Sequence, residues 1–274
     1  MSKKPILYRI GSIILGPIYK FYYNPKIIGK EKLHIKGAKL IVGNHIHLFD
    51  QCNTIISTKE FITFMAKKEY FDSASTRWFF SSVGCIPVDR SRKDDDATNK
   101  ALSVLSEYSA IGLFPEGTRN ALKESRLKEL YEEYKIDDDY KTFVKRMKHV
   151  KSSQVDKMIN LLNSRCISAL DFTKNLYDPD SYLKKLIGLD IITEDEYYDS
   201  NLLEFKFGAV SMAKKEDAYL IPTVITGHYK FRSKDLIVRF GDPFKITDMD
   251  LEDANKLLRD KMLELIKENY KSTK

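Results

Sequence analysis

Short apolar runs that end abruptly in polar residues constrain the fold of this chain most. Residues 38–42 (AKLIV) and 111–114 (IGLF) are runs of this kind, and residues 86–89 (IPVD) form a further run that ends in Asp89. Their length and β-branched content are typical of buried strands. Helical patterns separate such runs, as in 70–82 and 97–108, and this alternation predicts an α/β fold with right-handed crossovers. We therefore expect a largely parallel central sheet flanked by helices, with ligands bound at the carboxyl ends of the strands.

The first apolar run leads to a histidine and an aspartate. His45 can take up and release a proton near neutral pH, and Asp50 could hold its ring in one tautomer. On a straight helix these two positions would lie about 140° apart, so the pair meets only if the chain turns between them. A strand end that leads into a short helix capped by Asn44 would provide the turn. The spacing thus predicts a catalytic pair, His45 and Asp50.

The other two runs lead to turns that each carry an arginine, and one of these turns also carries a carboxylate, a glycine and a hydroxyl. Arg90 follows one run, and Glu116, Gly117, Thr118 and Arg119 follow the other. Arginine suits bidentate binding of phosphate, and glycine lets backbone N–H groups approach an anion. Two arginines and a His-Asp pair at strand ends indicate an enzyme for phosphorylated substrates.

Four blocks in order resemble the motifs of the glycerolipid acyltransferase superfamily, which includes the lysophosphatidic acid and glycerol-3-phosphate acyltransferases. His45 and Asp50 match its H-x4-D motif, and residues 114–119 match its F-P-E-G-T-R block. Residues 84–90 resemble the block between these two, and residues 219–224 resemble the fourth block. The resemblance covers roughly residues 25–120 and 203–245.

This resemblance implies transfer of a fatty acyl group from an acyl thioester to the free hydroxyl of lysophosphatidic acid, which makes phosphatidic acid. His45 would remove the hydroxyl proton, and a thiolate leaves without a strong acid, so no serine nucleophile is needed. Acyl-CoA or acyl-carrier protein is the expected co-substrate, with no other cofactor. Glycerol 3-phosphate or another lysolipid as acceptor, and a non-enzymatic lipid-binding protein, are the alternatives.

The remaining site residues take their roles from the same resemblance. Arg90 and Arg119, with Gly117 and Thr118, would hold the acceptor phosphate. Glu116 cannot attract a phosphate by charge, so it would bind a glycerol hydroxyl or hold Arg119 and the backbone of the turn. Pro222, in the fourth block, is expected near the acyl donor.

The first thirty residues contain six basic and no acidic residues. Apolar residues follow helical spacing there, so residues 1–24 are expected to form an amphipathic helix in a membrane interface rich in anionic lipids. The alternative is a helix that packs on the core. The longest uncharged run, Ile10 to Tyr19, is too short to span a bilayer and contains Pro17. A signal peptide is not expected, because an Ala-x-Ala type of cleavage site is missing.

Residues 121–202 are rich in Lys, Glu, Asp and Leu and lack strand alternation. We expect a helical insertion that interrupts an acyltransferase domain of residues 25–274. Its role is open between a lid or membrane-facing cover beside the phosphate site and a peripheral decoration.

Composition excludes several other classes. The three cysteines have no paired spacing, which argues against a disulfide framework or a zinc site and favours a reducing, cytoplasmic-side location. Together with the amphipathic segment, this location predicts peripheral or monotopic attachment to the cytoplasmic face of a membrane. The net charge is +7, but no nucleic-acid-binding motif accompanies it. His47 could suggest a metal site with His45, yet Phe49 and Gln51 stand where a metallohydrolase motif needs Asp and His. We expect no bound metal.

Overall fold

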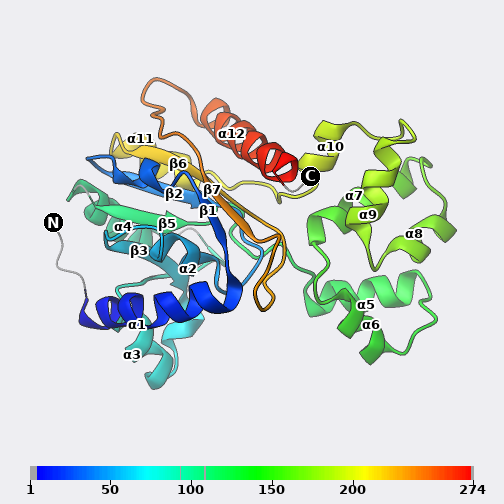
Figure 1. Cartoon of the computed structure of the whole chain (residues 1–274), viewed down its shortest axis with the longest axis horizontal. Coiled ribbons are helices and arrows are strands. Elements are labelled where there is room, and N and C mark those ends of the chain that lie inside the picture. The colour runs from blue at the N-terminus through cyan, green and yellow to red at the C-terminus, as the bar shows by residue number, and fades with distance from the viewer. Residues whose placement is uncertain (1–4, 93, 108, 273–274) are drawn as a thin grey trace. The chain divides into compact units, whose positions relative to one another are not determined.

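The computed structural model describes residues 5–92, 94–107 and 109–272. Residues 1–4 of the predicted amphipathic segment, with Lys3 and Lys4, lie outside the described residues. Contacts divide the chain into two compact units: unit 1 is Met1–Gly117 with Phe205–Lys274, and unit 2 is Thr118–Glu204. Figure 1 labels their elements.

Unit 1 contains the strands and the helices that flank them. Its strands are β1 (Lys26–Ile28), β2 (Lys39–Gly43), β3 (Ile62–Lys67), β4 (Ile86–Val88), β5 (Ala110–Leu113), β6 (Tyr219–Thr226) and β7 (Ile237–Phe240). Its α-helices are α1 (Ile6–Tyr23), α2 (Asp50–Ile55), α3 (Ala74–Ser82), α4 (Asp95–Ser106), α11 (Gly208–Lys215) and α12 (Leu251–Lys271). Two 3-10 helices, Lys30–His34 and Lys68–Phe71, complete it.

The described residues form one sheet of seven strands, in the order β1-β7-β6-β2-β5-β3-β4. Neighbouring strands run parallel except β6 and β7, which pair antiparallel. The predicted α/β class with a largely parallel sheet is therefore confirmed. Because β2, β5 and β4 run in the same direction, the segments that follow them emerge at one edge of the sheet.

Burial explains why the apolar runs form the central strands. All five residues of β2 are buried, including Lys39, whose Nζ donates to the carbonyl oxygens of Leu33 (3.0 Å) and Ile35 (2.7 Å) and pairs with Glu60. Strand β6 is buried along all but its first residue. Strands covered on both faces lose the apolar-polar alternation, as parallel sheets require.

Helix α1 begins unit 1 and continues through Pro17 to Tyr23. Asn24 then adopts a left-handed conformation, with φ of 50°, and its N–H bonds to the carbonyl oxygen of Lys20. Pro25 follows, so the helix cannot continue. Only Tyr8 and Gly16 are buried among the residues of α1.

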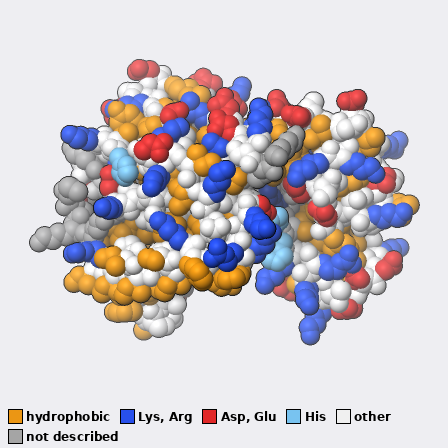
Figure 2. Space-filling model, viewed as in Figure 1, with side chains coloured by type: hydrophobic (Ala, Val, Ile, Leu, Met, Phe, Trp, Pro, Cys, Tyr) orange, Lys and Arg blue, Asp and Glu red, His pale blue; other side chains and the backbone are white. Residues whose placement is uncertain are grey.

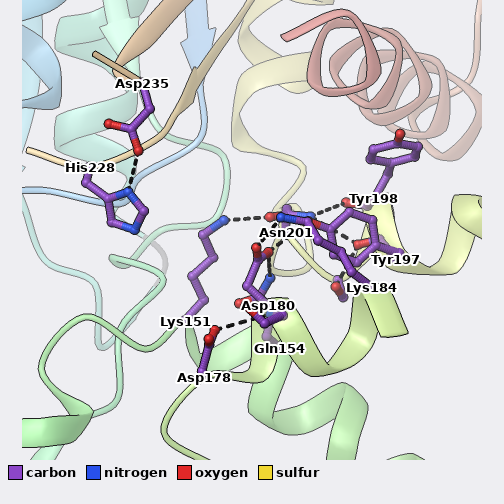
Figure 3. Close-up of polar contacts among 12 residues, drawn as sticks. Lys151, Gln154, Asp178, Asp180, Lys184, Tyr197, Tyr198, Asn201, His228 and Asp235 are labelled. Atoms are coloured by element: carbon purple, nitrogen blue, oxygen red, sulfur yellow. Dashed lines mark hydrogen bonds and ion pairs between the residues drawn. The ribbon is translucent and has the colours of Figure 1, made fainter. Parts of the chain in front are cut away.

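Unit 2 consists of short helices. They are α5 (Glu124–Glu133), α6 (Tyr140–Met147), α7 (Ser152–Asn163), α8 (Ala169–Asn175), α9 (Pro179–Ile187) and α10 (Glu194–Asp199). Asp180 joins three of them, because it accepts from Gln154 of α7, Lys184 of its own helix and Tyr197 of α10 (Figure 3). Fully buried Phe143, Met158 and Phe172 form part of an apolar interior. Unit 2 thus has packing and polar contacts of its own.

Candidate active site

His45 and Asp50 meet at the carboxyl end of β2. His45 Nδ1 lies 2.8 Å from Asp50 Oδ2. The same carboxylate oxygen accepts the backbone N–H groups of Ile46 and His47, each at 2.7 Å. These bonds fold the chain back between the two side chains and place Asp50 as the first residue of α2.

The surroundings of Asp50 determine which nitrogen of His45 carries a proton. Asp50 is fully buried, and its Oδ2 already accepts two N–H groups. A carboxylate in that position is an acceptor, so the Nδ1 of His45 donates to it. The His45 ring also stacks on Phe114, with centroids 4.1 Å apart and planes 9° apart. Nε2 is then the ring nitrogen that can accept a proton from a substrate.

Asn44 does not cap helix α2, contrary to the sequence-based expectation. Its side chain bonds instead to β6: Nδ2 donates to the carbonyl oxygen of Ile225 at 2.9 Å, and Oδ1 accepts from the N–H of Ile225 at 2.7 Å. Phe49 occupies the cap position and makes no capping bond with its side chain. The turn is closed by the carboxylate of Asp50 instead.

A second turn follows β5, beside the ring of His45. Phe114 carries the stacked ring, and its carbonyl oxygen accepts from the N–H of Gly117 at 3.1 Å. Gly117 has φ of +67°, a conformation that favours glycine. Glu116 is buried, with 3% of its surface exposed. Arg90, which follows β4, reaches this turn and donates from Nη1 to the carbonyl oxygen of Gly117 at 2.8 Å.

Lys206 also reaches this turn, and the sequence analysis did not assign it. Its backbone N–H donates to the carbonyl oxygen of Pro115 at 2.9 Å. Its side chain passes over Gly117, since a Cβ added there would lie 2.9 Å from Lys206 Cε and 3.2 Å from Nζ. The signal available in the sequence was the segment Phe205-Lys206-Phe207-Gly208, which resumes the pattern after the insertion.

The remaining predicted residues lie elsewhere. Thr118 and Arg119 are the first residues of unit 2 and line a hollow of about 290 Å³ there, with Lys123 and Arg126 among its other residues. Pro222 lies in the middle of β6, in register with Val42 of β2, and is buried. It lines a hollow of unit 1 together with Arg239 and Lys261.

Other reactive groups near the site have different environments. His47 stacks on Tyr229, with ring centroids 4.1 Å apart. Burial, together with the charge of Asp50, raises the pKa of Cys52 to about 11, and burial raises the pKa of Cys85 to about 11. Both thiols therefore stay protonated near neutral pH and are poor nucleophiles. Within the described ranges, no group of three or more His, Cys, Asp and Glu side chains could hold a metal ion.

An apolar surface lies along α1, and Figure 2 shows hydrophobic side chains gathered at the lower left, where Figure 1 draws α1 and α3. Its exposed members on α1 are Ile6, Ile10, Ile13, Ile14, Leu15, Ile18 and Phe21, and those on α3 are Trp78 and Phe79. We call these residues the apolar face. Among the described residues, no helix combines the length and the hydropathy needed to cross a bilayer.

Comparison with known proteins shows the family and the fold of this chain. The chain is 26% identical over 116 residues to the 1-acyl-sn-glycerol-3-phosphate acyltransferase of Bacillus subtilis (strain 168). That match covers 42% of this chain and spans 58% of the length of the relative. The crystal structure of the 1-acyl-sn-glycerophosphate (LPA) acyltransferase PlsC from Thermotoga maritima is similar in fold, with a TM-score of 0.52 and 14% identity. The similarity covers 95% of this chain and 86% of that one, and it supports the α/β fold described above.

A family model described as Acyltransferase matches residues 24–226, which include every site residue predicted from the sequence. This match confirms the resemblance drawn from the four motifs, and the chain belongs to the acyltransferase family.

Proposed function

We propose that this protein is an O-acyltransferase that moves a fatty acyl group from an acyl thioester to the free hydroxyl of lysophosphatidic acid, making phosphatidic acid for phospholipid synthesis. The pairing of His45 with Asp50, directly beside the turn at Gly117, is the main support for this proposal. A base and a cationic turn at one sheet edge suit a substrate with a reacting hydroxyl and a phosphate.

The proposed chemistry is direct acyl transfer. The acceptor hydroxyl attacks the thioester carbonyl, and Nε2 of His45 takes its proton as the new C–O bond forms. Asp50 stabilises the resulting imidazolium through Nδ1. The C–S bond then breaks, the thiolate leaves and is protonated, and the products are phosphatidic acid and a free thiol. The raised pKa values of Cys52 and Cys85 support direct transfer over a cysteinyl intermediate.

The acceptor phosphate would bind at the turn after β5. Arg90 bonds to the carbonyl oxygen of Gly117 through one nitrogen, which leaves further N–H groups of its guanidinium for a phosphate. Lys206 adds a second cation over Gly117. Thr118 and Arg119 follow Gly117 directly in the chain, and their role in binding the phosphate stays a prediction from the sequence. Glu116 would bind a glycerol hydroxyl, and Pro222 would border the donor site.

We further propose that the enzyme works at a membrane surface. The apolar face on α1 supports this, because exposed isoleucines in a basic segment favour insertion between anionic headgroups over packing on the core. The free cysteines Cys52, Cys85 and Cys166 support a reducing, cytoplasmic side.

The test is release of thiol from acyl-CoA by the purified full chain in detergent, with lysophosphatidic acid, glycerol 3-phosphate or no acceptor. The proposal expects release that depends on lysophosphatidic acid and is lost in His45→Ala. His34→Ala is the matched control, because it removes a histidine from a 3-10 helix of unit 1 that carries no proposed role.

Each other outcome revises a separate step. Release with glycerol 3-phosphate alone would change the acceptor, and full activity in His45→Ala would remove the assigned base. If acyl-CoA gives no release with either acceptor, acyl-carrier protein is tested as the donor. Binding of lysophosphatidic acid and acyl-CoA, without turnover of acyl-CoA or of the acyl-carrier protein thioester, would contradict the enzymatic function.

A further inference from the structure

Both carboxylate oxygens of Asp50 accept hydrogen bonds. The partners of Oδ2 all lie in the segment from His45 to Asp50, whereas the partner of Oδ1 comes from a distant part of the chain. Oδ2 accepts His45 Nδ1 and the two backbone N–H groups that follow His45. Oδ1 accepts the hydroxyl of Tyr229 at 2.6 Å, from a residue 179 positions later in the chain. Since Asp50 is fully buried, water cannot replace a lost partner freely.

The direction of the Tyr229 bond follows from its other partner. The amide nitrogen of Asn53, in α2, donates to the Tyr229 oxygen at 2.6 Å. A tyrosine hydroxyl has a single proton, and with a donor facing its oxygen that proton points to Asp50. Asn53 is itself fixed, because its Oδ1 accepts from the hydroxyl of Tyr19 of α1 at 2.9 Å.

The ring of Tyr229 is also held in place. It stacks on His47, with ring centroids 4.1 Å apart and planes 16° apart. Burial and the neighbouring charge of Asp50 raise the pKa of Tyr229 well above its ordinary value of 10.0. The hydroxyl therefore keeps its proton through the neutral range and remains a donor.

We propose that Tyr229 is a positioning residue for the reaction, acting through Asp50. Its hydroxyl fixes Oδ1, which stops the carboxylate from rotating and keeps Oδ2 on Nδ1 of His45. The acceptor proton then meets Nε2 in one orientation. This role rests on the proposed function of His45 and Asp50. The hydrogen-bonded series Tyr19–Asn53–Tyr229 supports the Asp50 carboxylate from α1 and α2. A substitution farther from Asp50 in this series should therefore lower kcat by less.

The first experiment compares Tyr229→Phe with wild type in the thiol-release assay. Loss of a hydrogen bond to a charged group, with the ring kept, is expected to lower kcat by about tenfold to a hundredfold. KM for both substrates should stay within about twofold, because Tyr229 binds neither of them. Tyr19→Phe should lower kcat by less. Tyr23→Phe is the matched control: its ring lies 5.4 Å from that of Tyr229, and within the described structure it has no bond to Asp50.

A double-mutant cycle separates positioning from general support of the fold. In an Asp50→Asn background, Tyr229→Phe should cost little further kcat, because its effect passes through the carboxylate. An equal cost in both backgrounds would overturn the proposal, as would a loss of kcat and melting temperature together with a rise in KM.

The same series distinguishes failure of the inference from failure of the proposed function. If His45→Ala is inactive and Tyr229→Phe behaves as wild type, the positioning role is wrong while the base stands. If His45→Ala keeps full activity, the assigned base is wrong, and the role of Tyr229 falls with it.

Discussion

Arg90 Nη1 lies 2.8 Å from the carbonyl oxygen of Gly117, although these residues follow β4 and β5 and strand β3 lies between the two in the sheet. The bond brings a guanidinium to the turn that follows the stacked Phe114. Because the donor group is fixed by the backbone of the turn, its remaining N–H groups are oriented before a ligand arrives.

Removal of this guanidinium is expected to weaken binding of the phosphorylated acceptor. Arg90→Ala should raise KM for lysophosphatidic acid by about tenfold to a hundredfold, the range for a hydrogen bond to a charged group, with a smaller change in kcat. Arg90→Lys should restore little, since an ammonium cannot bond to Gly117 and a phosphate in the same fork geometry. The measurement is steady-state thiol release against acceptor concentration.

The control for this series is Arg77→Ala. Arg77 also donates to backbone carbonyl oxygens, those of Phe71 and Asp72, but it lies on α3. Arg77→Ala should leave KM for lysophosphatidic acid unchanged. An unchanged KM in Arg90→Ala as well would remove Arg90 from the phosphate site.

Asn44 should matter for stability, because its side chain joins the end of β2 to β6. Asn44→Ala leaves the buried N–H and carbonyl groups of Ile225 without these bonds. At about 1–3 kcal/mol for each of these two buried groups, the free energy of unfolding should fall by about 2–6 kcal/mol. Urea unfolding followed by circular dichroism measures the change. Exposed Asn99 on α4 is the control, and Asn99→Ala should stay within about 0.5 kcal/mol. Equal values for both variants would contradict the bridging role.

Local pattern was sufficient for the buried strands and for the positions of the motifs. The run 38–42 was predicted as a strand, and β2 covers Lys39–Gly43 with all five residues buried. Continuous apolar runs predict such strands well because burial on both faces requires them. Strand β1 was not predicted, since three residues with one exposed end are too short to show a pattern.

Contacts between distant residues could not be read from the sequence. Asn44 carries a typical capping side chain, but its partner is 181 residues away. Tyr229 and Lys206 likewise reach the site from segments after unit 2. A single sequence gives spacing along the chain and does not give pairing across the sheet.

Leu251 also fits the core spacing of α12, yet it is exposed because it is the first residue of the helix.

The apolar face should bind vesicles that contain anionic lipid. Ile13, with 69% of its surface exposed, and Ile18, with 58%, both lie on α1. Burying an isoleucine side chain contributes about 1.5–3 kcal/mol, so Ile13→Gln with Ile18→Gln should reduce vesicle binding by about a hundredfold or more. Binding by wild type should fall with added salt, because basic residues contribute by attraction to the headgroups. Co-sedimentation with vesicles measures both effects.

Leu170→Gln is the control for this experiment. Leu170 is 61% exposed and lies on α8 of unit 2, outside the apolar face. If all variants bind vesicles equally, α1 is not the membrane-binding element.

Asp180 should make the stability of unit 2 depend on pH. Burial acts to raise its pKa, but hydrogen bonding to Lys184, the charge of Lys151 and the hydroxyl of Tyr197 outweigh this and lower the pKa below its ordinary value of 3.8. A carboxyl whose pKa is lower in the folded state contributes stability above its unfolded pKa and loses it as pH falls through the folded pKa. The contribution should therefore be complete near neutral pH and decline only below about pH 4.

Asp180→Asn tests this sign with little change in side-chain volume. The amide keeps a single acceptor oxygen, while Gln154, Lys184 and Tyr197 all donate to this position. At about pH 7 the variant should lose about 1–3 kcal/mol, measured by hydrogen exchange of the α7 and α9 amides. The difference from wild type should shrink as pH falls below about 4, because the wild-type carboxyl then becomes neutral as well. Asp190→Asn, on an exposed residue after α9, should show no such dependence. A difference between Asp180→Asn and wild type that stays constant from neutral to acidic pH would mean that Asp180 acts through shape alone, and that its charge does not hold α7, α9 and α10 together.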